Sequence, residues 1–470
     1  MSMNTAFSLP PSIWPIIVSP SRRPFVPKNS TRHFDASYYF FAVYPVLPDY
    51  FAIELGGGLP LLKASRILIL LLLISSLIYN KGKVHLPIKR IRRMNMLIPL
   101  LMYFTGRILA NAFYLLRLSE SINAEFSIIF EQLILLIVIL QFIDGREQVL
   151  GCINAVVCGS GVVACVSIIS VFIGQNIFYY LDNVSRSMLM AATTRMGIVR
   201  AEAGFGHPVY YGVYCALVIP LSYYLYENKK KNSYLVICIL NIVALLLTES
   251  RGSIVALAFM IVIAIVRMNK IRRQKIIKII IVTIVIVGMA FILIPNVANQ
   301  ISDIFKSLFA IMNTNIEIDD FGGNSSTGLD SRLIQFTGIY WTIMGNAVFG
   351  LGASCHTRGV LRYYKNTKGW FETTTIDNGF VGYFVQEGIL GTIGFLALIF
   401  GAIKSSNKLS EKKDKSNANN VFVICFIVYV IEMFSVADAS QMFWLTVILF
   451  LAYNIVDSIP SGKIMEKNNG

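Results

Sequence analysis

The sequence predicts an all-α polytopic membrane protein of about twelve transmembrane helices, with a large helical loop between the ninth and the tenth. Composition is the first indication, because 55% of the 470 residues are hydrophobic, only 14% are charged and the mean hydropathy is +0.64. In a soluble domain about a quarter of the residues are charged. The other two indications are the recurrence of long apolar windows and the alternation of basic loops between them.

The apolar windows are read as helices because about 20 apolar residues cross a hydrocarbon core of roughly 30 Å. The seventh and eighth windows are short. The twelve predicted helices are 38–55, 64–79, 96–116, 125–143, 149–174, 208–226, 234–248, 253–266, 279–295, 379–403, 420–436 and 441–455.

Basic residues sort the loops onto two sides of the membrane, because Lys and Arg are retained in the cytoplasm. With the amino terminus inside, every second loop is basic, which predicts an even number of crossings and two cytoplasmic termini. The cytoplasmic segments hold most of the 41 Lys and Arg and are 1–37, 80–95, 144–150, 227–233, 267–278, 404–419 and the tail. The net charge of +15 is therefore mainly a topology signal. We do not interpret this positive charge as a sign of nucleic-acid binding, because that function would require a basic face on a soluble module.

These assignments divide the chain into seven segments. They are a disordered cytoplasmic arm (1–37), helices one to five (38–174), an outer loop (175–207), helices six to nine (208–295), a large outer loop with short helices (296–378), helices ten to twelve (379–457) and a cytoplasmic tail (458–470). The arm lacks the pattern of a signal peptide. No Cys/His metal spacing or Gly-rich phosphate loop is present, so we expect neither a metal nor a cofactor.

The large outer loop is the expected place of the chemistry. A transporter has no need of such a loop, because its substrates bind among helices near the midplane of the bilayer. The first part, from Ile301 to Met312, has apolar residues at helical spacing and predicts an amphipathic helix on the membrane surface. A second helical stretch, Ser331 to Gly345, is expected to pack back onto the bundle. The loop is thus predicted to form a small helical cap.

Arginines come from three separate outer segments. A guanidinium matches phosphate oxygens with a planar fork and is always charged, so converging arginines indicate a lipid-linked phosphate or pyrophosphate ligand. Alternatively, each could contact lipid headgroups or pair with surface carboxylates. Arg251 differs from the others because a tight turn between two apolar helices confines it to the interface. The arginines are Arg195, Arg200, Arg251, Arg332, Arg358 and Arg362.

Two further residues near these segments have a functional and a structural interpretation. Asp377 is either the general base that takes a proton from an acceptor hydroxyl or the N-cap of the following helix, and both can hold together. His207 precedes Pro208 and is either a substrate contact or only an interface residue, because Pro is normal in a first helical turn.

Arg107 and Asn111 lie one turn apart inside the third predicted helix, where an ion needs a partner. Glu131 or Glu432 is the expected partner of Arg107 in a structural ion pair. A role of Arg107 and Asn111 in lining a substrate site is the alternative.

Several segments, taken in order over about residues 195 to 400, resemble the O-antigen ligase and polymerase family of bacterial envelope glycosyltransferases. The segments are Arg200-Ala-Glu202-Ala-Gly-Phe-Gly-His207-Pro, Thr248-Glu-Ser-Arg251-Gly, Asp330-Ser-Arg332, Asn346-Ala-Val-Phe-Gly350-Leu-Gly352, and Asp377-Asn378 followed after nine residues by Gly388-Ile-Leu-Gly391. The resemblance implies a GT-C-like fold in the bacterial inner membrane. It also implies an active site on the periplasmic side.

One departure separates two subtypes of that family. Its ligases carry His where this chain has Asp377, which favours a polymerase. Polymerases are also described with Arg, ten residues and Gly in both large outer loops, a pattern that Arg195 to Gly206 and Arg358 to Gly369 satisfy. Arg186 to Gly197 fits it as well.

The resemblance implies transfer of a glycan from undecaprenyl pyrophosphate to another lipid-linked repeat unit, without nucleotide sugar or metal. Arg200, Arg251 and Arg332 would stabilise the leaving pyrophosphate, and Asp377 would act as base or position the acceptor. The expected substrate contacts are Arg195, Glu202, His207, Arg358, Arg362 and Asn378. Membrane lipids and a polysaccharide chain-length regulator are the expected partners.

Three other functions remain open at this point. The chain could be a ligase that transfers the glycan to lipid A core or another acceptor. It could be a flippase or transporter of lipid-linked oligosaccharide, although the outer loops are unequal and the two halves are not alike. It could also be a membrane subunit without activity, which the arginines of the outer segments make less attractive.

Overall fold

The structure is a computed structural model, and part of the chain is described. The described residues are 31–48, 50–56, 59–82, 87–112, 119–143, 145–183, 194–195, 198–267, 273–274, 329–353, 361–365, 369–373, 376, 378–411, 418–436 and 440–457. The ninth predicted transmembrane helix and the predicted amphipathic helix from Ile301 to Met312 lie outside these residues.

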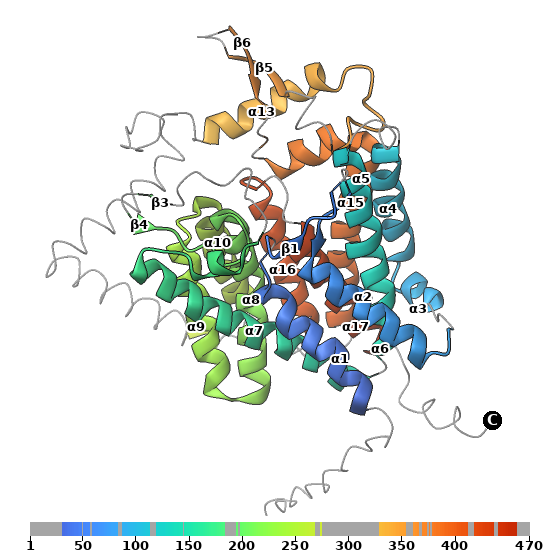
Figure 1. Cartoon of the computed structure of the whole chain (residues 1–470), viewed down its shortest axis with the longest axis vertical. Helices are drawn as coiled ribbons and strands as arrows, with labels where there is room; N and C mark the ends of the chain where they lie inside the picture. The colour runs from blue at the N-terminus through green and yellow to red at the C-terminus, as the bar shows by residue number, and fades with distance from the viewer. Residues whose placement is uncertain are drawn as a thin grey trace, which may run out of the picture.

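Within the described residues the fold is a bundle of α-helices (Figure 1). The helices are α1 (Thr31–Val43), α2 (Ala64–Tyr79), α3 (Ile88–Arg93), α4 (Leu97–Ala112), α5 (Ser119–Phe126), α6 (Leu135–Phe142), α7 (Arg146–Ile173), α8 (Pro208–Lys229), α9 (Asn232–Leu247), α10 (Arg251–Arg267), α13 (Leu329–Thr342), α15 (Gly379–Glu411), α16 (Ala418–Glu432) and α17 (Ser440–Asp457). A π-helix, Ser127–Ile134, joins α5 to α6, and short 3₁₀ helices cover Tyr44–Val46 and Ile177–Leu181.

The helical membrane class is confirmed, whereas the number of twelve crossings is not. Four of the described helical stretches are long and apolar enough to cross a membrane: Ser121–Phe142, Arg146–Ile173, Pro208–Lys229 and Gly379–Lys408. Six shorter apolar helices accompany them. Several boundaries agree with the sequence; α8, for instance, begins at Pro208 as predicted, because a proline at the first helical position needs no amide hydrogen.

Among the described residues, three short antiparallel pairs of strands depart from the all-helical expectation. They are β1 (Ala52–Ile53) with β2 (Leu62–Lys63), β3 (Thr194–Arg195) with β4 (Ile198–Val199), and β5 (Leu361–Lys365) with β6 (Gly369–Thr373). The first pair lies at the end of the first predicted helix, whose α-helical part ends at Val43. Pro45 and Pro48 follow there, and proline does not continue a helix.

The hairpin β5–β6 replaces part of the helical cap expected in the large outer loop. Its strands are rich in aromatic residues, which favour extended backbone. The hairpin packs on α13, where the Arg362 amide donates to the Thr342 hydroxyl at 2.9 Å. In Figure 1, α13 and the hairpin lie above the bundle, beyond the beginning of α15.

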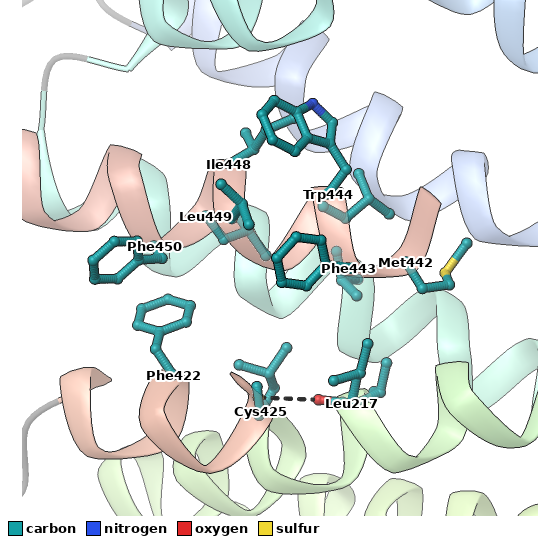
Figure 2. Packing of buried hydrophobic residues seen from close by; sticks show 14 of the residues in the cluster. Leu217, Phe422, Cys425, Met442, Phe443, Trp444, Ile448, Leu449 and Phe450 are labelled. Carbon is teal, nitrogen blue, oxygen red and sulfur yellow. Dashed lines mark hydrogen bonds between the residues drawn. The ribbon is translucent and has the colours of Figure 1, made fainter. Parts of the chain in front are cut away.

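The core of the bundle is built from apolar side chains of helices far apart in sequence. Figure 2 shows Phe443 and Phe450 of α17 facing Phe422 and Cys425 of α16. The Cys425 thiol donates to the Leu217 carbonyl oxygen of α8 at 3.5 Å, so even this weak donor has a partner. The last two helices therefore pack against the middle of the chain.

Two buried ion pairs connect helices inside the bundle, and they correct the predicted partners of Arg107. Arg66 Nε lies 2.5 Å from Glu131 Oε1, and its other nitrogens donate to Leu61 O at 2.6 Å and Ser127 Oγ at 2.8 Å. The Glu131 carboxylate is therefore paired with Arg66 of α2. The partner of Arg107 is Glu387 of α15, at 2.6 Å, and neither Glu131 nor Glu432.

Replacing Glu131 with Ala should lower the amount of protein in the membrane and its thermal stability. The change leaves the Arg66 guanidinium buried without its carboxylate, and breaking a buried pair costs about 3–5 kcal/mol. Membrane yield and the thermal melting of detergent-purified protein measure the effect. The double variant Arg66→Met with Glu131→Leu should recover much of the loss. Normal yield and melting in Glu131→Ala would contradict this structural role.

Candidate functional site

Two segments that the sequence singled out meet at the end of the bundle where α9 gives way to α10. Arg200 Nε donates to the Thr248 carbonyl oxygen at 2.8 Å, and the Ala201 amide donates to the Leu247 carbonyl oxygen at 2.9 Å. Residues 200–207, here called the arginine segment, are thereby fixed on the turn 248–251 that leads to Arg251. The structure thus brings the backbone of these two distant stretches into direct contact.

The arginine segment is held from its other side by the 3₁₀ helix that follows α7. The Tyr179 hydroxyl donates to the Glu202 carboxylate, at 3.1 Å from Oε1 and 3.0 Å from Oε2, and Glu202 is buried. The Asn176 side-chain amide donates to the Ala203 carbonyl oxygen at 2.8 Å. Ala203 adopts a left-handed φ of 52°, which is uncommon for a residue with a Cβ. These contacts hold the backbone around Arg200 in one conformation.

The turn 248–251 is equally constrained. The buried Thr248 hydroxyl donates to the Leu245 carbonyl oxygen at 2.6 Å and accepts from the Ser250 amide at 3.2 Å. Glu249 has a φ of 49°, the second left-handed residue with a side chain at this site. Such residues cost on the order of 1–3 kcal/mol and persist where surrounding contacts enforce them, often at functional sites.

Arg251 is the first residue of α10 and is 9% exposed. A cation at this position opposes the helix dipole, whose amino-terminal end is positive, so nearby negative charge is required to make it favourable. The fully buried Glu432 at the end of α16 is a carboxylate close to the start of α10. A Cβ built on the next residue, Gly252, would lie 3.4 Å from Glu432 Oε2 and would overlap the Ser435 side chain. The ends of α10 and α16 therefore meet closely around Arg251.

The beginning of α15 completes this end of the bundle. Asn378 is buried, and its Oδ1 accepts from the amides of Phe380 at 3.0 Å and Val381 at 3.2 Å, so Asn378 is the N-cap of α15. The Gly379 amide donates to the Met433 carbonyl oxygen at 2.6 Å, which fixes the start of α15 to the end of α16. Within the described part of the chain the buried Asn378 Nδ2 has no hydrogen-bond partner.

His207 caps α8 at the edge of the same site. Its Nδ1 accepts from the Val209 amide at 3.2 Å, so the imidazole replaces the usual short N-cap side chain. Burial lowers the pKa of His207 to about 4, and the neighbouring Arg200 guanidinium lowers it as well. The imidazole is therefore neutral at physiological pH and acts as an acceptor through Nδ1.

The remaining predicted site residues are placed in part or not at all. Asp377 and Arg358 lie outside the described residues, and for Arg195 in β3 and Arg332 in α13 only the backbone is described. Arg362 lies in β5 with an exposed side chain. The structure therefore places Arg200 and Arg251. The convergence of a third arginine with them stays a prediction.

Two carboxylates that the sequence did not assign to the site lie on helices that reach it, Glu432 beside the start of α10 and Glu387 at the far end of the first part of α15. Glu432 was considered only as a partner of Arg107, yet it lies beside the start of α10. Glu387 directly precedes Gly388-Ile-Leu-Gly391, and this position next to the motif was an unused signal. Their common property is a carboxylate in an otherwise apolar window, where an ion needs a partner.

The fold and this site define a polytopic helical membrane protein with an arginine-bearing turn at one end of the bundle. Residues 236–396 match the family model described as O-antigen ligase. The match includes the turn 248–251 and the start of α15, and it supports an assignment to the O-antigen ligase and polymerase family of membrane glycosyltransferase-like enzymes. This match supports a role in surface polysaccharide biosynthesis. No curated protein matches the chain.

The neutral state of His207 predicts a pH dependence of stability. The folded pKa of about 4 lies below the ordinary value of 6.5, so between these values the unfolded chain binds the proton that the fold excludes. The contribution of neutral His207 to the free energy of unfolding should be fully present above about pH 6.5 and should be lost as the pH falls toward 4. Thermal melting across this range should be steeper for the wild type than for His207→Asn, which keeps an N-cap acceptor without a titrating group. Equal slopes would contradict the assignment.

Proposed function

We propose that the protein is a polymerase of bacterial surface polysaccharide, such as O-antigen or capsule. In the proposed reaction the reducing-end sugar of a growing glycan leaves undecaprenyl pyrophosphate and is joined to the non-reducing sugar of another lipid-linked repeat unit. An acceptor hydroxyl loses its proton and forms the new glycosidic bond, while the bond from the donor sugar to pyrophosphate breaks. The observation that carries the proposal is the attachment of Arg200 to the turn that holds Arg251.

Positive charge at this turn suits a departing diphosphate. Negative charge develops on the pyrophosphate in the transition state, and fixed donors directed at developing charge lower the barrier. The amino terminus of α10 adds the positive end of a helix dipole, which favours phosphate. A bound diphosphate would also make the position of Arg251, which opposes the dipole of its own helix, favourable.

The acceptor side of the proposed reaction belongs to the Asp377-Asn378 pair. Asn378 is fixed as the cap of α15 beside the end of α16, and its buried Nδ2 is a donor suited to a sugar hydroxyl. Asp377, the neighbouring residue in sequence, is our proposed base for the acceptor hydroxyl. We infer that the site opens to the periplasmic side of the inner membrane, because the loops assigned to the cytoplasm are the basic ones.

Arg251→Ala should abolish long-chain polysaccharide while the protein remains in the membrane. Loss of one charge-stabilising donor typically lowers the rate by about 100-fold or more. Chain length is measured on gels of polysaccharide extracted from a deletion strain that carries the variant.

Arg267→Ala is a matched control, because Arg267 ends the same helix that Arg251 begins. It removes the same charge at the opposite end of α10 and should leave chain length unchanged. Wild-type chain length in Arg251→Ala, at equal membrane level, would remove Arg251 from the mechanism.

The second function to weigh is ligation to lipid A core, because the matching family model is described as O-antigen ligase. Asp377, where ligases of the family carry His, favours the polymerase. A deletion strain should accumulate acceptors capped with single repeat units if the protein polymerises. Accumulation of full-length polymer that is not attached to its acceptor would instead identify a ligase.

A further inference from the structure

The helix α15 is interrupted at Gly388, whose φ of 63° and ψ of −163° are not helical. The interruption separates a first part, Gly379–Glu387, here called the bar, from a longer second part. Figure 1 shows the beginning of α15 lying across the end of the bundle below α13, while the rest runs beside α4. The bar follows its cap Asn378, at the proposed acceptor side, and ends beside α4.

The interruption is built into the fold, because another segment satisfies the backbone groups that it frees. In a continuous helix the amides of residues 389 and 390 would donate to the carbonyl oxygens of residues 385 and 386. Instead, those carbonyl oxygens accept from the Leu351 and Gly352 amides at 2.9 and 2.8 Å. The Ile389 and Leu390 amides donate to the carbonyl oxygens of residues 347 and 348 at 2.8 and 3.1 Å. A Cβ on Gly388 would lie 2.5 Å from the Gly350 nitrogen.

An ion pair fixes the end of the bar to α4. Glu387 Oε1 lies 2.6 Å from Arg107 Nε, and both side chains are buried. Arg107 Nη1 also donates to the Tyr103 hydroxyl at 2.6 Å, and the guanidinium lies 5.5 Å from the ring centre of Tyr383 in the bar. A Cβ on Gly391 would lie 2.8 Å from Glu387 Oε2, so this glycine leaves room for the carboxylate.

The two ends of the bar link the ion pair to the proposed active site. Nine residues separate Asn378 from Gly388, which as a helix span about 13 Å. Adding or removing one residue would rotate one end relative to the other by about 100°. The position of Asn378 beside the end of α16 therefore depends on how the far end of the bar is held.

We propose that Arg107 is a positioning residue of the polymerase, acting through Glu387 and the bar on Asn378. The proposal rests on the proposed function and explains why nine residues separate Asn378 from Gly388. It also assigns different tasks to the two glycines of Gly388-Ile-Leu-Gly391. Gly388 admits the pairing with residues 347–352, and Gly391 admits the Glu387 carboxylate.

The test uses the full chain purified into proteoliposomes, with a lipid-linked single repeat unit as the substrate. Arg107→Gln should lower kcat by about 100-fold, because a displacement of about 1 Å at a reacting centre costs on that order, while KM changes little. Arg107→Lys keeps the charge and should retain part of kcat. Gly391→Ala, which crowds the Glu387 carboxylate, should lower kcat in the same direction.

Arg66→Gln is the matched control, because it breaks a buried Arg–Glu pair that does not touch the bar. It should lower stability without changing kcat per folded protein. The double variant Arg107→Gln with Glu387→Gln removes the unpaired charge and should recover melting temperature, because the cost of an uncompensated ion disappears. Its kcat should stay low, since the attachment of the bar is still lost.

The outcomes separate the two proposals. A wild-type protein that never lengthens the substrate would overturn the proposed function itself. An active wild type with unchanged kcat in Arg107→Gln would overturn only the positioning role. Recovery of kcat together with melting temperature in the double variant would reduce Arg107 to a structural residue and would also overturn it.

Discussion

The arrangement of this bundle depends on one constraint: polar groups placed among apolar helices must find partners within the protein. An unpaired polar group in an apolar environment costs several kcal/mol, so its partner decides which segments come together. Arg66 and Arg107 each recruit a glutamate from another helix, and each guanidinium is completed by further acceptors. The interrupted backbone of α15 recruits a whole segment of the outer loop for the same reason.

The same constraint shapes the end of the bundle where the site lies. Two left-handed residues, Ala203 and Glu249, are held by hydrogen bonds that join the arginine segment to the turn before α10. The result is a rigid arginine-bearing surface, with little backbone left to order when a ligand arrives. Preorganised charge of this kind stabilises a transition state without reorganisation during the reaction.

Much of the fold could be predicted from sequence, because apolar windows report directly on helices that bury most of their surface. Prolines and glycines marked several boundaries, such as the start of α8 at Pro208. The strands β5 and β6 were not predicted, because apolar and polar residues do not alternate clearly in these loop segments. The predicted partner of Arg107 was also wrong. Depth in the membrane was the only criterion for choosing it, and depth does not distinguish Glu131, Glu387 and Glu432, which lie on different helices.

Those parts of the site that lie in sequence motifs could be predicted. Thr248 to Arg251 and the segment from Arg200 were identified as motifs, but their hydrogen bonds to each other come from folding and leave no mark in either segment alone. The cap of α15 was expected from Asp377 and is provided by Asn378, since both residue types satisfy amide hydrogens equally well.

The Arg107–Glu387 pair has a consequence for biogenesis. The two residues are separated by 280 positions (387 − 107), so at roughly 5–20 residues per second the ribosome needs about 15–60 s to deliver the second after the first. During this interval α4 carries a cation whose final partner has not been synthesised. Gln132 and Tyr103, both made early, already lie within reach of its guanidinium, at 3.5 and 2.6 Å in the finished fold. These two residues give the Arg107 guanidinium hydrogen-bond partners in the nascent chain until Glu387 has been synthesised.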